Sequence, residues 1–67
     1  MPDLFDKRTV PLGEQIACVE RELRQRIRVY GRLVVEGKMT QAKSDAEMAA
    51  MRAVLETLRG LQAGEAA

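Results

Sequence analysis

The fold is decided by the stretch Arg26-Ile-Arg-Val-Tyr-Gly-Arg-Leu-Val-Val-Glu-Gly-Lys-Met-Thr40. Gly37 is a favoured residue just beyond a helix C-terminus, where the backbone turns left-handed. Thr40 is a favoured N-cap for a following helix. Because long helical patterns lie on both sides, this stretch predicts the bend of an antiparallel helical hairpin.

The segment 12–36 carries the pattern of one amphipathic helix. Its apolar residues recur at steps of three and four, at Leu12, Ile16, Val19, Leu23, Ile27, Tyr30 and Val34. This spacing is typical of one face of an α-helix. Gly31 lies inside the segment and permits either a close approach of another backbone or a local kink.

A second helix is predicted over residues 41–61. Ser44-Asp-Ala-Glu47 fits a capping box and offers a later start at 45, but the shorter link favours 41. Apolar residues form one stripe along Met48, Met51, Leu55 and Leu58, and a second along Ala46, Ala50, Val54 and Leu61. One partner helix covers only a narrow stripe, so two stripes predict a second partner. The candidate oligomer interface is Met48, Met51, Val54, Leu55 and Leu58.

Length and composition favour self-association. A chain of 67 residues forms one small domain at most. We expect a tail or arm over 1–11, the hairpin over 12–61 and a C-terminal tail over 62–67. Cys18 is the single cysteine and histidine is absent, so neither an intrachain disulfide, nor a metal site, nor a cofactor is expected. A monomer of this size is marginal without such supports. We therefore predict an all-α, two-helix antiparallel hairpin that forms a homo-oligomer, a dimer or higher, as a helical bundle.

Several classes of protein are disfavoured by the sequence. No apolar run approaches 18 residues, and the first six residues lack the basic and apolar regions of a secretory signal, so we expect a cytoplasmic protein without a membrane partner. Eleven basic against ten acidic residues make nucleic-acid binding less favoured. Without histidine, and without a nucleophile paired with a base, we expect a non-enzymatic protein.

Basic charge is concentrated before the bend. Residues 21–38 hold six basic and two acidic residues, a local charge of +4 in a chain of +1. Arg24, Arg28 and Arg32 are four residues apart and share one helical face. Arginine suits bidentate capture of carboxylate or phosphate. The alternative is a solvated face, with ion pairs from Glu20 to Arg24 and from Glu22 to Arg26.

Three further residues extend this candidate site. Tyr30 is either a core residue with a solvated hydroxyl or a stacking residue at a pocket mouth. Lys38 and Thr40 could hold an anion at the start of the second helix, where free N–H groups point outward. The candidate ligand- or partner-binding set is Arg24, Arg28, Tyr30, Arg32, Lys38 and Thr40.

The chain also resembles a group of short proteins from phages and prophages of proteobacteria. The resemblance covers about residues 12–61 and is carried by Ile16-Ala-Cys-Val-Glu-Arg-Glu-Leu-Arg-Gln-Arg-Ile-Arg-Val-Tyr-Gly-Arg-Leu-Val34, by Gly-Lys-Met-Thr40 and by Glu47-Met-Ala-Ala-Met-Arg-Ala-Val-Leu-Glu-Thr-Leu58. It implies an accessory role inside the bacterial host cell. Two functions fit: binding that inhibits or modulates a host regulator or defence component, and a sponge that sequesters an anionic (cyclic) nucleotide between subunits.

Overall fold

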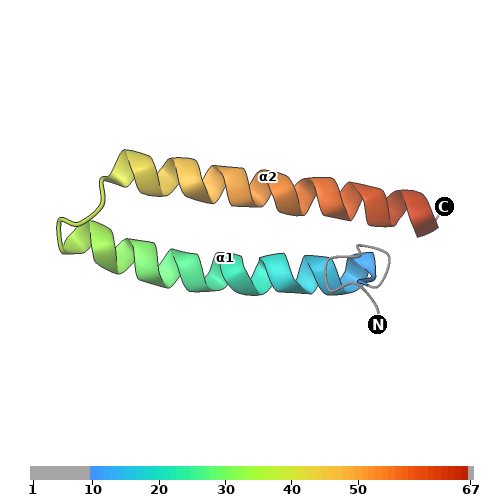
Figure 1. Ribbon diagram of the computed structural model, residues 1–67. Helices are drawn as coiled ribbons and strands as arrows, with labels where there is room; N and C mark the ends of the chain where they lie inside the picture. The colour runs from blue at the N-terminus through green and yellow to red at the C-terminus, as the bar shows by residue number, and fades with distance from the viewer. Residues whose placement is uncertain (1–9, 67) are drawn as a thin grey trace, which may run out of the picture.

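The protein is a helical hairpin. The computed structural model describes residues 10–66, which form helices α1 (Leu12–Val35) and α2 (Gln41–Ala66) and no strand. The helices pack side by side and antiparallel, so the start of α1 and the end of α2 lie at the same end (Figure 1). The predicted all-α hairpin is confirmed. Of the tail or arm predicted over 1–11, residues 1–9 lie outside the described residues.

The bend ends α1 as its glycine predicts. Gly37 has a φ of +74° and donates its N–H to the Val34 carbonyl at 3.0 Å. Lys38 donates to the Leu33 carbonyl at 2.8 Å. These two bonds form a Schellman motif, which satisfies carbonyls that the last helical turn leaves open.

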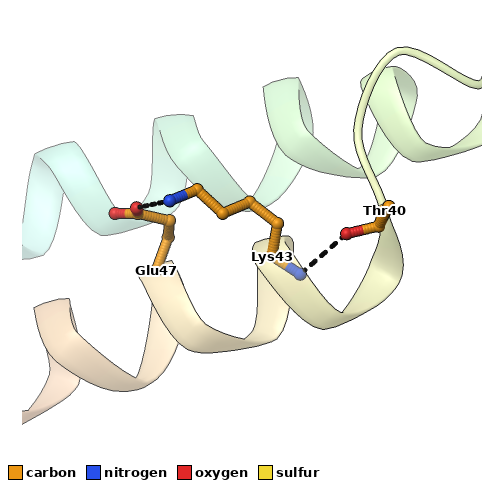
Figure 2. Close-up of polar contacts among 3 residues, drawn as sticks. All are labelled: Thr40, Lys43 and Glu47. Atoms are coloured by element: carbon orange, nitrogen blue, oxygen red, sulfur yellow. Dashed lines mark hydrogen bonds and ion pairs between the residues drawn. The ribbon is translucent and has the colours of Figure 1, made fainter.

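The predicted start of α2 at residue 41 is also confirmed. The Thr40 hydroxyl accepts the Lys43 N–H at 3.1 Å (Figure 2). The Thr40 carbonyl accepts the Ser44 N–H at 3.1 Å. In the same turn, Lys43 pairs with Glu47 at 3.0 Å (Figure 2). Thr40 therefore caps the helix, and the alternative start at 45 is wrong.

The far end of α2 differs from the prediction. The helix continues to Ala66, through residues 62–66 that the sequence indicated as part of a tail. Gly60 and Gly64 each weaken a helix by about 1 kcal/mol relative to alanine. No proline interrupts the segment, and its glutamine, glutamate and alanines favour helix, so the pattern extends to the end of the described chain.

The seam between the helices departs from the stripe expected from the sequence at Ile27. Ile27 is 49% exposed, and the half-buried residue at its level is Arg26. Val34, on the expected stripe, is half-buried, and so is its neighbour Leu33. The buried or half-buried residues of α1 that follow a heptad are Leu12, Ile16, Val19, Leu23, Arg26, Tyr30 and Leu33. Their alternating steps of four and three average 3.5 residues, the period of helices that coil gently around each other.

The core of the hairpin is small. Within the described residues the buried apolar side chains are Ile16, Met48 and Leu55, at 6 to 8% exposure, and none is fully buried. Met48 and Leu55 were predicted to lie at the oligomer interface. Within the single chain both are buried, because α1 covers the first apolar stripe of α2, and the oligomer interface stays a prediction.

Candidate functional site: an arginine face on α1

Four arginines occupy the outer side of α1. They recur at steps of three and four, and all are exposed: Arg21, Arg24, Arg28 and Arg32. At about 100° per residue, Arg32 lies about 180° around the helix from Leu23, which faces α2. We call these four residues the arginine face. The hairpin creates this face, because packing α2 against one side of α1 leaves the opposite side to solvent.

Carboxylates near the arginine face bind other cations. Glu22 pairs with Arg26 at 3.8 Å, and Glu36 pairs with Lys38 at 3.5 Å. Glu20 reaches across the seam to Arg59 of α2, with a 2.8 Å contact. Within residues 10–66, no ion pair involves the arginine face. The local excess of positive charge is therefore concentrated on these four exposed guanidinium groups.

The expected ion pairs form only in part. The predicted pair between Glu22 and Arg26 is present. The predicted pair between Glu20 and Arg24 is replaced by the contact from Glu20 to Arg59, a residue 39 positions away in the sequence. Arg24 consequently has no carboxylate partner in the described part of the chain. Helical spacing alone does not predict this contact, because it relates only residues of the same helix.

Arg28 separates two open depressions on this surface. One has a volume of about 350 Å³ and is lined by Gln25, Arg28, Val29 and Arg32. The other has a volume of about 440 Å³ and is lined by Arg24, Ile27 and Arg28. A single helix provides all the walls, so both depressions are open to solvent. Small-molecule sites usually surround most of their ligand, whereas these suit contact with a broader surface.

Gln25 and Val29 were not among the candidate residues. Gln25 lies four residues after Arg21, and Val29 lies four residues after Gln25. Residues four apart are neighbours on a helix surface. The same spacing that identified the arginines could therefore have identified these two.

Tyr30, Lys38 and Thr40 do not join the arginines. Tyr30 is half-buried in the seam, and its two-residue offset from Arg28 and from Arg32 places it about 160° around α1 from both. Lys38 contacts Glu36, and the Thr40 hydroxyl caps α2. The structure thus brings Arg24, Arg28 and Arg32 together and places the other three candidates elsewhere.

The described residues contain no group of three His, Cys, Asp or Glu side chains placed to hold a metal ion. Neither helix there is long and apolar enough to cross a membrane. Comparison of the chain with protein-family models, with curated proteins and with solved structures finds no match. The candidate function therefore rests on the residues and their geometry.

Proposed function

We propose that the protein is a non-enzymatic phage accessory protein of the bacterial cytoplasm, which binds a host regulator or defence component and inhibits or modulates it. The binding surface is the arginine face, displayed on an oligomeric helical scaffold. The observation that carries the proposal is the set of four exposed arginines on one side of α1, none of them ion-paired within residues 10–66.

The spacing of the arginines indicates the chemistry of the partner. Successive residues four apart rise about 6 Å along a helix, so Arg24, Arg28 and Arg32 form a row about 12 Å long. A partner surface with carboxylates at a similar spacing offers a bidentate acceptor to each guanidinium group. Such charge complementarity favours fast association and rejects basic partners. An acidic protein surface is therefore the favoured target.

The runner-up function is a sponge for an anionic (cyclic) nucleotide. Its support is the pair of depressions beside Arg28, whose volumes fall in the range of ligand sites. One helix cannot enclose a nucleotide, and Tyr30 lies on another side of α1. A sponge would therefore need residues from a second subunit to complete the pocket. This requirement places it behind the protein-binding function.

The decisive test compares Arg28→Glu with Arg52→Glu. Arg52 is an exposed arginine on α2, so the two variants change the net charge equally. Each tagged variant is used to capture proteins from a lysate of the bacterial host, and captured proteins are identified by mass spectrometry. We expect Arg28→Glu to lose a partner that the parent protein and Arg52→Glu retain. Retention of every partner by Arg28→Glu would exclude the arginine face as the binding surface.

Native mass spectrometry separates the two functions. A nucleotide sponge purified from host cells would carry extra mass of nucleotide size, which Arg28→Glu would lack. A protein-binding inhibitor would give an oligomer without that mass. The same spectrum reports the number of subunits.

A further inference from the structure

The two sides of the helix–helix seam differ in character. The ion pair between Glu20 and Arg59, at 2.8 Å, marks one side. Val29 is nine residues after Glu20 and therefore lies about 180° around α1 from it. Val54 and Leu61 lie about 140° and 160° around α2 from Arg59. Val29, Val54 and Leu61 thus share the side away from the ion pair, which we call the apolar side.

Apolar side chains continue from the seam onto this side of α2. Each step of three residues turns about 60° around a helix in the same direction. Met48 is buried, Met51 is half-buried, and Val54 is 48% exposed. One heptad later, Leu55 is buried, Leu58 is half-buried, and Leu61 is 56% exposed. The apolar surface therefore runs outward without a break.

On the other side of the seam, towards the Glu20 contact, the apolar surface of α2 does not extend beyond the buried residues. Arg52 follows Met48 by four residues, and Arg59 follows Leu55 by four. A step of four turns about 40° the other way, towards the side of the Glu20 contact. Charged residues therefore border the seam of α2 on one side, and apolar residues extend it on the other.

Two ion pairs flank the apolar side, and Glu65 lies near its end on α2, seven residues after Leu58. Glu22 and Arg26 pair at 3.8 Å on α1, and Lys43 and Glu47 pair at 3.0 Å on α2. Glu22 is seven residues before Val29, and Glu47 is seven residues before Val54. Seven residues are close to two helical turns, so both glutamates lie on the apolar side. A two-fold contact sets a surface against its own copy. An apolar surface flanked by paired charges tolerates this arrangement, whereas the arginine face would repel itself.

The chain exposes more surface than a compact monomer of its mass. The chain exposes 5374 Å², whereas a compact monomer of this mass exposes about 4,200 Å². The excess is about 1,200 Å², of the same order as the roughly 800 Å² that each partner of a standard interface buries. The radius of gyration of 15.1 Å likewise exceeds the roughly 10 to 11 Å of a compact domain of this length.

We propose that a second copy of this chain packs on the apolar side, through Val29, Val54 and Leu61, and closes a two-fold four-helix bundle. The half-buried Met51 and Leu58 become core residues of that bundle. Arg28 lies about 100° around α1 from Val29 and stays exposed, while Arg32 lies at the rim. The inference specifies the oligomeric scaffold in the proposed function and rests on that function only for the role of the outward arginines.

The oligomeric state of matched variants tests the inference. Val54→Glu places a charge on the apolar side. Ala49→Glu places the same charge on an exposed position of α2, about 140° away. By analytical ultracentrifugation we expect a parent dimer, an unchanged dimer for Ala49→Glu, and a dissociation constant raised at least about tenfold for Val54→Glu. A monomeric parent protein at 100 µM (about 0.1 mM, well above the dissociation constant of a specific interface), or equal effects of the two variants, would overturn the inference.

A milder variant distinguishes loss of the dimer from unfolding of the protomer. Leu61 is more than half exposed in the hairpin, so Leu61→Ser removes little from the protomer. We expect it to retain the helical circular dichroism of the parent at high protein concentration and to weaken the dimer about three- to tenfold. A folded Leu61→Ser variant with parental dimer affinity would contradict the proposed face.

Cys18 provides an independent readout. It is exposed in the hairpin and lies about 20° around α1 from Val29, so the second copy would shield it. We expect its reaction with an aromatic disulfide reagent to slow as the parent concentration rises, and to stay fast in Val54→Glu. A rate independent of concentration in the parent would count against the interface. Partner capture that survives loss of the dimer would leave the arginine face intact as the binding surface.

Discussion

At the scale of single residues, two glycines near the bend have opposite roles. Gly37 adopts a left-handed φ of +74°, which side chains disfavour. Gly31 is helical, and a Cβ added to it would meet nothing within 4 Å in the hairpin. Of the two roles that the sequence left open for Gly31, the structure of the single chain shows no close backbone approach. Its missing side chain therefore makes room for no other backbone within the hairpin.

The first prediction concerns these two positions. Gly31→Ala should raise the free energy of unfolding by up to about 1 kcal/mol, because alanine favours helix. Gly37→Ala should lower it by about 1 kcal/mol, because alanine strains the left-handed turn. Urea denaturation followed by circular dichroism measures both. A destabilised Gly31→Ala variant would reveal a backbone contact at this glycine outside the single hairpin.

At the scale of helices, each element begins and ends at a local hydrogen-bonding signal. Thr40 caps α2 through its hydroxyl, and the Schellman motif ends α1. The Thr40 cap replaces part of the hydrogen bonding that the first turn of a helix lacks. The hairpin thus depends on a few polar atoms in its bend as well as on its small core.

The second prediction concerns the cap. Thr40→Ala should lower the free energy of unfolding by about 1 kcal/mol, since it leaves the Lys43 N–H without its acceptor. Thr40→Asp should retain most of the stability, because aspartate also caps helices. Thermal denaturation at fixed protein concentration compares the two variants. Equal losses in both would show that the hydroxyl contact contributes nothing.

The third prediction tests the register of the seam. Leu55→Ala should cost about 2 to 4 kcal/mol, because it truncates a buried leucine. Ile27→Ala should cost roughly 1 kcal/mol or less, because that isoleucine is about half exposed. The sequence stripe, which places Ile27 in the seam, predicts similar losses instead. Urea denaturation at matched protein concentrations distinguishes the two registers.

At the scale of the whole molecule, the hairpin presents two surfaces of different chemistry. The arginine face is charged and unpaired within the described chain, and the apolar side is formed by aliphatic residues flanked by two ion pairs. Electrostatic contacts between exposed groups weaken as salt screens them, whereas burial of apolar surface does not. Salt should therefore affect the two proposed interactions differently.

The fourth prediction follows from this difference. Raising sodium chloride from about 50 mM to about 500 mM shortens the screening length from roughly 14 Å to 4 Å. Capture of the acidic partner should weaken at least about tenfold, and dimer affinity should stay constant or rise. Binding assays and ultracentrifugation across the same salt series measure both. A dimer that dissociates with salt would indicate an electrostatic interface, contrary to the apolar side.

The fifth prediction concerns stability and concentration. Only folded chains dimerise, so dimerisation stabilises the folded state. The midpoint temperature of thermal unfolding should therefore rise with protein concentration. The rise should be absent in Val54→Glu and present in Ala49→Glu. Differential scanning fluorimetry with an external dye measures the thermal midpoint across a hundredfold range of protein concentration. A constant midpoint in the parent would mean that the small hairpin core alone provides the stability.

The sequence by itself determined the two helices, the bend and the row of arginines. Gly37 and Thr40 act through bonds to residues within five positions, and helical spacing alone places Arg24, Arg28 and Arg32 on one face. Such local interactions are readable without knowledge of the fold. The end of α2 was the exception, because two glycines in a run of helix-favouring residues leave the stopping point ambiguous.

Only the tertiary structure decided which apolar residues form the core and with which cations the carboxylates pair. Periods of 3.5 and 3.6 residues are hard to separate over one helix, so the choice between Arg26 and Ile27 for the seam depended on how α2 packs. The same packing buried Met48 and Leu55, exposed Val54 and drew Glu20 to Arg59. These outcomes depend on contacts between distant parts of the chain, which a local pattern does not contain.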